Sequence, residues 1–292
     1  MTKNVGFIGL GIMGAQMAAH IQKAGYALYV YTRSKAKAND LIQGGARWCD
    51  SPMEVAKSCQ VIFTIVGFPQ DVREIYFGNN GLIENTQSGA ILCDMTTSEP
   101  ALAIEIAKCA SPKNIHVLDA PVSGGDTGAK NATLSIMVGG EKQVFEQLLP
   151  LLKLMGKNIV YQGESGCGQH CKMCNQIVIA GTMMGMIEAL RYAKESGLCQ
   201  QQLLAAISKG AAGSWSLDNL APRIVNNDTA PGFLIKHFLK DMEIAAKEAQ
   251  NIDLNVPVLQ KAIEYYKKAV SAGGENMGTQ GLYALWEQNP QW

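Results

Sequence analysis

The stretch Val5-Gly6-Phe7-Ile8-Gly9-Leu10-Gly11-Ile12-Met13-Gly14 predicts a strand, a tight turn and the start of a helix. Apolar residues run from Val5 to Ile8, and small or apolar residues then recur at helical spacing as far as Ala24. Such glycines permit a tight turn, close approach of the backbone to a pyrophosphate and close helix packing. An ordinary glycine-rich turn is the alternative. We expect a dinucleotide to bind at Gly9, Leu10, Gly11, Ile12, Met13 and Gly14.

Strands alternate with helices through the rest of the front half. Helices are expected at residues 36–42 and 52–59, the second because Ser51 and Pro52 supply an N-cap and a proline at the first helical position. Further apolar strands are expected at residues 28–31, 61–66, 90–95 and 116–120. The alternation predicts an α/β Rossmann-type doubly wound sheet, mostly parallel, with ligands beyond the carboxyl ends of its strands.

The back half has helical patterns and no clear strand signal. A long helix is expected from Gln169 to about Glu195, and shorter ones at residues 200–212, 235–250, 257–270 and 282–287. We place the boundary near 163–168, which gives a dinucleotide-binding Rossmann domain at 1–164 and an all-helical substrate and dimerisation domain at 165–292. Glycine and methionine residues at 181–186 predict close backbone packing on another helix, either of this chain or of a second subunit. Because the long helix also carries few charges, we expect a homodimer or homotetramer.

Charge and hydropathy exclude several classes of partner. The 25 basic and 25 acidic residues leave no net charge, so no overall field favours nucleic acid or an anionic membrane, and a small-molecule partner is expected. The start, residues 1–8, lacks the apolar core of a signal peptide. The most apolar stretch, 177–190, is too short to span a bilayer and carries Glu188. These features predict a cytoplasmic protein with no membrane segment.

Eight cysteines without a secretory signal are typical of reduced thiols. Cys167, His170, Cys171 and Cys174 have spacings compatible with zinc, but they lie at one predicted helix start with no second pair downstream. Buried free cysteine is common as a small apolar residue. We therefore expect no metal.

The residues after the second predicted strand bear on the choice of cofactor. Thr32, Arg33 and Ser34 stand where an acidic residue would bind the ribose hydroxyls of NAD. A guanidinium beside small hydroxyl residues suits a 2′-phosphate instead, so NADP is preferred and NAD remains possible. The alternative is that Arg33 stacks on the adenine ring, which fits either cofactor.

Four ordered motifs resemble those of the β-hydroxyacid dehydrogenase family, and the likeness covers essentially the whole chain. They are Gly6 to Gly14, Asp119-Ala120-Pro121-Val122-Ser123-Gly124-Gly125, Gly166 to Gln176, and Lys240-Asp241. The family includes 3-hydroxyisobutyrate dehydrogenase, tartronate semialdehyde reductase and glyoxylate/succinic semialdehyde reductase. The resemblance implies hydride transfer between a nicotinamide and a short 3-hydroxy acid or semialdehyde.

Hydride transfer at a carbonyl carbon requires a group that gives or takes the proton of the oxygen. The resemblance assigns this role to Lys172, which as a generic lysine would be a solvated surface residue. Its unperturbed pKa, about 10.4, would have to be lowered by desolvation or a neighbouring cation. Asn175, three residues later, shares its helix face. Gln176 stands where many relatives carry a second Asn; tartronate semialdehyde reductases resemble this chain, so it bears on substrate choice.

The remaining contacts also follow from the family pattern. Ser123, Gly124 and Gly125 are expected to hold a substrate carboxylate through hydroxyl and backbone N–H groups; an ordinary tight turn is the alternative. Phe233 packs either over the site or in the core. The nicotinamide half is expected to contact Val66, Gly67, Phe68 and Thr97, with Lys240 near both nicotinamide and substrate.

The leading hypothesis is an NAD(P)-dependent dehydrogenase resembling 3-hydroxyisobutyrate dehydrogenase. The alternatives are a tartronate or succinic semialdehyde or glyoxylate reductase, and a non-catalytic NADP-binding regulator. Decarboxylating 6-phosphogluconate dehydrogenase is disfavoured because its lysine motif carries a His absent here and its helical domain is far longer. Imine reductases share the plan but usually lack the lysine.

Overall fold

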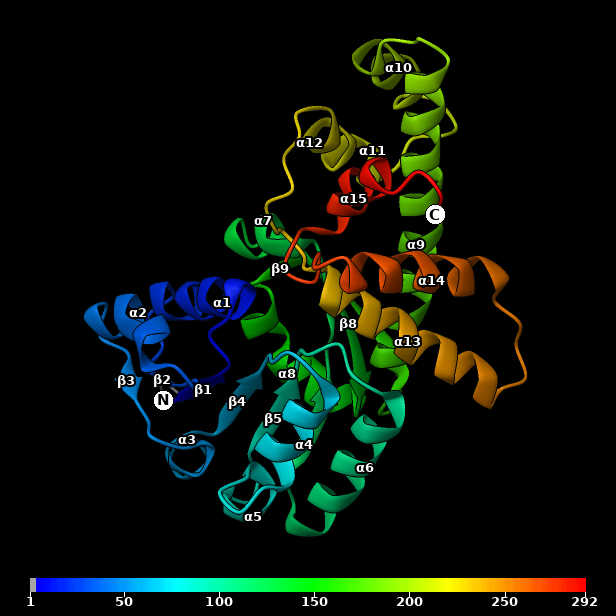
Figure 1. The fold of residues 1–292 in the computed structure, drawn as a ribbon. Helices are drawn as coiled ribbons and strands as arrows, with labels where there is room; N and C mark the ends of the chain where they lie inside the picture. The colour runs from blue at the N-terminus through cyan, green and yellow to red at the C-terminus, as the bar shows by residue number, and fades with distance from the viewer. Residues whose placement is uncertain (1–3) are drawn as a thin grey trace. The chain divides into compact units, whose positions relative to one another are not determined.

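A computed structural model describes residues 4–292 of the chain. It divides into two compact units, the first ending at Lys172 and the second formed by Met173–Trp292 (Figure 1). The expectation that the chain begins without a signal peptide rests partly on residues 1–3, which lie outside the described residues.

The first unit is built on one sheet, to which nine strands contribute within residues 4–292. They are β1 (Val5–Ile8), β2 (Leu28–Tyr31), β3 (Arg47–Trp48), β4 (Val61–Thr64), β5 (Ile91–Asp94), β6 (His116–Asp119), β7 (Val122–Ser123), β8 (Leu134–Gly140) and β9 (Gly156–Gly163). Their order is β3-β2-β1-β4-β5-β6-β8-β7, with β9 beside β8. Strands β1 to β6 run parallel and have the order of a dinucleotide-binding Rossmann sheet, which confirms the predicted fold class.

Helices connect these strands. They are α1 (Ile12–Lys23), η1 (Lys35–Ala38), α2 (Asn39–Gln43), α3 (Pro52–Ser58), α4 (Pro69–Phe77), α5 (Leu82–Asn85), α6 (Pro100–Ala110), η2 (Ser111–Lys113), α7 (Gly125–Lys130) and α8 (Lys142–Leu152). The predicted start of α3 is correct: Ser51 accepts the Glu54 N–H and Pro52 is the first helical residue.

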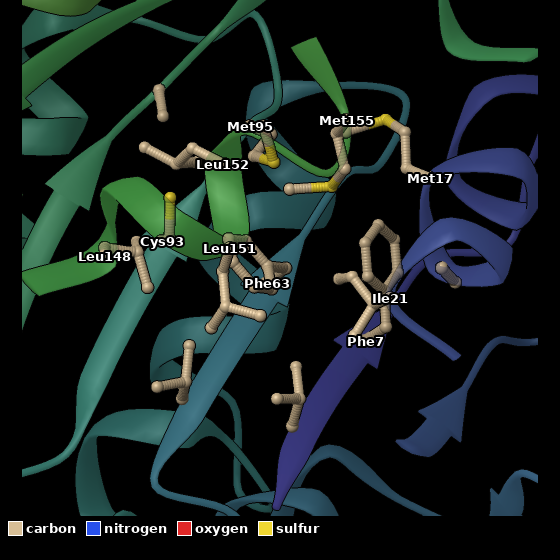
Figure 2. Packing of buried hydrophobic residues seen from close by; sticks show 14 of the residues in the cluster. Phe7, Met17, Ile21, Phe63, Cys93, Met95, Leu148, Leu151, Leu152 and Met155 are labelled. Atoms are coloured by element: carbon tan, nitrogen blue, oxygen red, sulfur yellow. The ribbon is translucent and has the colours of Figure 1, made fainter. Parts of the chain in front are cut away.

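Each face of the sheet has its own apolar core, because successive side chains of a strand point to opposite faces. On one face, the Phe7 and Phe63 rings stack at 6.1 Å and pack with Met17 and Ile21 of α1 and Leu151 of α8 (Figure 2). The other core joins alternate strand residues to α3, α4, α5 and α6; it includes Ile8, Val55, Ile62, Tyr76, Leu82, Leu92 and Ile106. Burial on both faces explains why these strands are continuous apolar runs rather than alternating patterns.

The sheet extends beyond the five predicted strands. Residues 47–48 form an edge strand too short to give a periodic signal. Past residue 120, β8 runs antiparallel to β6 and β7, and β9 runs parallel to β8. Strand β9 has many exposed residues, so its sequence lacks the apolar run of the central strands. The sheet is therefore mostly parallel with a mixed edge.

The second unit is helical. Its elements are most of α9 (Cys167–Glu195), then α10 (Gln200–Ile207), α11 (Trp215–Asn219), α12 (Ala221–Val225), α13 (Ile235–Asn251), α14 (Pro257–Ser271), η3 (Thr279–Gly281) and α15 (Leu282–Gln288). The predicted helices occur, but α10 ends five residues before the predicted residue 212, ahead of Gly210 and Gly213. Neither α11 nor α12 was predicted. Among the described residues of this unit, the β-type backbone pairing consists of one isolated antiparallel bridge, between Leu234 and Gly278.

Helix α9 is longer than the apolar stretch identified in the sequence. It spans 29 residues and has an apolar window of mean hydropathy 1.3, so by length and composition alone it is able to cross a membrane. Core helices of soluble proteins meet the same criterion. One side of α9 contributes Ala180, Met183, Ile187 and Leu190 to the buried core of the second unit.

Candidate active site

The turn between β1 and α1 depends on glycine at two of its positions. Gly9 has φ +96°, and a Cβ there would overlap the Ile65 carbonyl oxygen. A Cβ on Gly14 would overlap the Gly9 carbonyl oxygen, whereas one on Gly11 would meet nothing within 4 Å. No side chain caps the α1 N-terminus, and its first turn carries no acidic residue. Such a helix N-terminus favours an anionic ligand, which is the property expected of Gly9 to Gly14.

Arg33 forms an ion pair with Asp71, a residue 38 positions later in the chain. Its guanidinium is 82% exposed, and Nη1 lies 3.1 Å from Oδ1 of Asp71 in α4. The other Asp71 oxygen accepts the Phe68 N–H at 3.1 Å. Asp71 thus joins Arg33 to the predicted segment Val66 to Phe68. In the sequence, Asp71 has only the signature of a helix start.

The segments after β4 and β5 are bound to each other. The Val66 N–H donates to Thr96 Oγ1 at 3.0 Å, and the Thr96 N–H donates to Asp94 Oδ1 at 3.1 Å. Thr97, a predicted cofactor contact, follows directly. The structure therefore brings together the two segments expected to contact the nicotinamide half.

Asp94 is a buried carboxyl that sequence reasoning missed. It ends β5, and the Thr64 hydroxyl donates to its Oδ1 at 2.8 Å. Burial raises the pKa of Asp94 to about 6, although hydrogen bonds from Thr96 and Thr64 oppose the shift. In register, Asp94 stands beside Asp119 of β6. A row of polar side chains thus crosses the sheet at its carboxyl edge.

Asp119 anchors the start of α9. Its Oδ1 accepts the Gly166 N–H and its Oδ2 accepts the Gln169 N–H, both at 2.8 Å, and its side chain is buried. Burial raises the pKa of Asp119, whereas these backbone donors lower it. A Cβ on Gly168 would lie 2.5 Å from the Met137 carbonyl oxygen and 2.6 Å from that of Asp119. The motif beginning at Asp119 is therefore in contact with the motif beginning at Gly166.

Lys172 lies on α9, one turn after Gln169, and is only 5% exposed. This burial contradicts the alternative in which it is a solvated surface lysine. Asn175 and Gln176 follow on the same helix at spacings of three and four residues, and so lie on the same side of it. Lys172 closes the first unit, and Asn175 and Gln176 belong to the second.

In the second unit, a buried carboxylate joins two of the predicted residues. Gln176 Nε2 donates to Asp241 Oδ2 at 2.7 Å, and Lys240 Nζ lies 2.7 Å from Asp241 Oδ1. Gln176 is 1% exposed, and its Oε1 has no hydrogen-bond partner among residues 4–292. Asp241 therefore holds both side chains, a role suggested only loosely by the Lys240-Asp241 motif.

The remaining predicted substrate contacts are Phe233 and the turn formed by Ser123, Gly124 and Gly125. Phe233 is partly buried against the second unit's core, with its ring centroid 6.0 Å from that of Phe238. Ser123 ends β7, and Gly124 and Gly125 follow with φ of +132° and +63° at the start of α7. All three residues of this turn are partly exposed, so their polar groups can be reached from solvent.

Cys167, His170, Cys171 and Cys174 lie in the first turns of α9. No cluster of three or more His, Cys, Asp and Glu side chains that could hold a metal ion occurs within residues 4–292. Within residues 4–292 none of the eight cysteines forms a disulfide, and Cys49, Cys59 and Cys93 are buried.

Comparison with known proteins agrees with this geometry. Residues 4–163 match the family described as the NAD binding domain of 6-phosphogluconate dehydrogenase, and residues 166–286 match the one described as NAD-binding of NADP-dependent 3-hydroxyisobutyrate dehydrogenase. The two matches together span nearly the whole chain. The chain belongs to the β-hydroxyacid dehydrogenase family.

Individual relatives span the chain almost completely. The uncharacterized oxidoreductase YkwC of Bacillus subtilis is 54% identical over 98% of this chain and 99% of its own length. The 2-hydroxy-3-oxopropionate reductase of Escherichia coli is 36% identical and covers 95% of each chain. The structure of Mycobacterium tuberculosis 3-hydroxyisobutyrate dehydrogenase with L-serine has a TM-score of 0.88 at 27% sequence identity. The match covers 97% of this chain and 99% of that one. This β-hydroxyacid dehydrogenase is an NAD(P)-dependent oxidoreductase of small hydroxy acids.

Proposed function

We propose that the chain interconverts a short 3-hydroxy acid and its semialdehyde with NADP, and that Lys172 carries the proton. The observation that supports this most is the burial of Lys172 on α9, whose first turn is anchored by Asp119 at the carboxyl end of β6. In such a sheet, cofactor and substrate bind beyond this edge. A non-catalytic regulator would have no need of a buried lysine there.

The proton and hydride balance as follows. In the oxidative direction, Lys172 Nζ accepts the hydroxyl proton as the hydride leaves the carbon. NADP, when bound, supplies the nicotinamide that takes the hydride. Asn175, on the same helix side, donates to the developing carbonyl oxygen. Ser123, Gly124 and Gly125 hold the substrate carboxylate through the hydroxyl and N–H groups of their turn.

In this proposal, Gln176, Lys240 and Phe233 of the second unit bind the substrate. Asp241 orients Lys240 and Gln176, while Phe233 supplies an apolar wall beside the core. We propose functional domains at 1–164 for the dinucleotide and 165–292 for substrate and dimerisation. A homodimer or homotetramer in the cytoplasm is part of the same proposal.

Two substrate classes have specific support. The match of residues 166–286 to the 3-hydroxyisobutyrate dehydrogenase family favours a 3-hydroxyisobutyrate-like substrate. Gln176 favours tartronate semialdehyde, because its longer side chain reaches Asp241 and because the Escherichia coli relative is a 2-hydroxy-3-oxopropionate reductase. Succinic semialdehyde and glyoxylate are the further alternatives.

The test is turnover of the native protein and of Lys172→Ala on one panel. The panel holds 3-hydroxyisobutyrate, D-glycerate, 4-hydroxybutyrate, glyoxylate, succinic semialdehyde and tartronate semialdehyde, each with both cofactors. We expect Lys172→Ala to lower kcat by about 10²–10⁴-fold, the range for a positioned acid/base. NADPH affinity, measured by fluorescence, should stay nearly native.

Lys172→Arg serves as the matched control, because it keeps the charge but stays protonated at neutral pH and should not restore turnover. If Lys172→Ala keeps most of the native turnover, another group carries the proton. If the native protein oxidises or reduces nothing on the panel, the proposed substrate class is wrong.

A further inference from the structure

Gln169 is a buried glutamine in the first turn of α9 whose side chain bonds to another segment. Its Nε2 donates to the Thr96 carbonyl oxygen at 2.7 Å, and its Oε1 accepts the Ser98 N–H at 3.0 Å. The side chain is 0% exposed, so both bonds lie away from water. Gln169 therefore holds the backbone on both sides of Thr97.

The backbone of Gln169 is held at the same time by a second strand end, since its N–H donates to Asp119 Oδ2 at 2.8 Å. The Thr96 hydroxyl oxygen in turn accepts a hydrogen bond from the Val66 N–H. One residue thus connects the ends of β4, β5 and β6 to the helix that carries Lys172. Lys172 lies three residues further on, which is less than one turn of helix.

We propose that Gln169 is a positioning residue, which sets the helix of Lys172 in register with the nicotinamide-binding segments after β4 and β5. This inference rests on the proposed role of Lys172. An amide is the group that fits, because one side chain must donate to a carbonyl and accept from an N–H. A displacement of about 1 Å at such a site is enough to cost about 10²-fold in rate.

Gln169→Glu and Gln169→Met separate positioning from simple stability. Above the pKa of the introduced Glu, which burial raises, the ionised side chain has no proton for the Thr96 carbonyl, whereas below that pKa its carboxylic acid donates again. Relative to native protein at each pH, kcat of Gln169→Glu should fall by about 10–100-fold toward alkaline pH and recover toward acid pH. Gln169→Met, which has similar length but neither polar group, should stay slow throughout.

The kinetic isotope effect identifies the step. With nicotinamide-deuterated NADPH, the effect on kcat should increase in Gln169→Met at every pH and in Gln169→Glu toward alkaline pH, because misplaced groups make hydride transfer limiting. NADPH affinity should stay close to native, since the pyrophosphate turn lies elsewhere, between β1 and α1. A loss of folded enzyme would lower kcat but leave the isotope effect unchanged.

Gln22→Glu is the matched control. Gln22 also donates from Nε2 to a backbone carbonyl, that of Leu41 at 2.9 Å, within the α1 and α2 region. It should keep the native isotope effect and pH profile. Native kcat with an unchanged isotope effect in Gln169→Met would overturn the proposal.

Hydrogen exchange of the cofactor-free protein gives a readout independent of turnover. The Ser98 amide should exchange faster in Gln169→Met than in native protein, because its acceptor has been removed. Unchanged protection of residues 96–98 would show that the Gln169 side chain does not hold this segment, and would overturn the proposal. Faster exchange with native kinetics would overturn only its role in positioning, and absence of native turnover on every substrate would instead count against the proposed function.

Discussion

Arg33 shows how one side chain can depend on a distant partner. Its ion pair with Asp71 is exposed on the arginine side, and exposed pairs contribute only about 0–1 kcal/mol. The guanidinium is therefore able to turn toward a 2′-phosphate, a stronger bidentate acceptor than the carboxylate. The Arg33–Asp71 pair is therefore weak enough to break if the proposed 2′-phosphate binds Arg33.

We predict that Arg33→Ala weakens NADPH selectively. Loss of a hydrogen bond to a charged group costs about 1.5–3 kcal/mol, or about 10- to 150-fold in Kd. The Kd of NADH should change little, and fluorescence titration measures both. Arg73→Ala, which removes an exposed arginine paired with Glu105, is the control and should leave both constants near native. Equal native affinity for the two cofactors would contradict the preference for NADP.

At the scale of elements, the first turn of α9 is a tightly packed junction of the first unit. It meets the ends of β6 and β8 so closely that neither Gly168 nor Gly139 has room for a side chain. A Cβ on Gly139 would lie 2.6 Å from Asp119 Oδ1 and 2.7 Å from the Gly168 nitrogen. These neighbours are mainly backbone and a buried carboxylate, so they cannot move aside by rotating a flexible chain.

We predict that Gly168→Ala lowers the free energy of unfolding by about 1–3 kcal/mol, the usual cost of overpacking. Because the strain lies beside Asp119, kcat should fall as well. Denaturant unfolding and turnover are the measurements. Gly210→Ala is the matched control, since a Cβ there meets only the Ile207 carbonyl oxygen, at 3.8 Å. Native stability of Gly168→Ala would show that the junction relaxes.

On the scale of the whole molecule, the proposed assembly depends on α9. Val178 and Tyr192 of this helix are 63% and 73% exposed, and the second unit also exposes Ile252, Leu254 and Val258. Exposed apolar side chains that form one contiguous patch are typical of an interface. Open space at Gly185 would also allow another backbone to approach.

We predict a homodimer or homotetramer by light scattering at micromolar concentration. Val178→Glu should shift the mass toward the monomer, because it places a charge in the proposed contact. Val160→Glu, at an exposed valine of β9, is the control and should keep the native mass. A monomeric native protein would contradict the assembly.

Local chain geometry was enough to predict the Rossmann sheet, its glycine turn and the long helix, whereas the role of Lys172 came from the family resemblance. Glycine with positive φ, apolar runs and helical spacing are properties of neighbouring residues, so they are legible in the sequence. Only the tertiary structure decided that Asp71 pairs with Arg33, that Gln169 bridges Thr96 and Ser98, and that Gln176 bonds to Asp241. These partners lie 38 to 73 residues apart, and a hydrogen bond across such a distance depends on how strands and helices pack, which leaves no periodic signal along the chain.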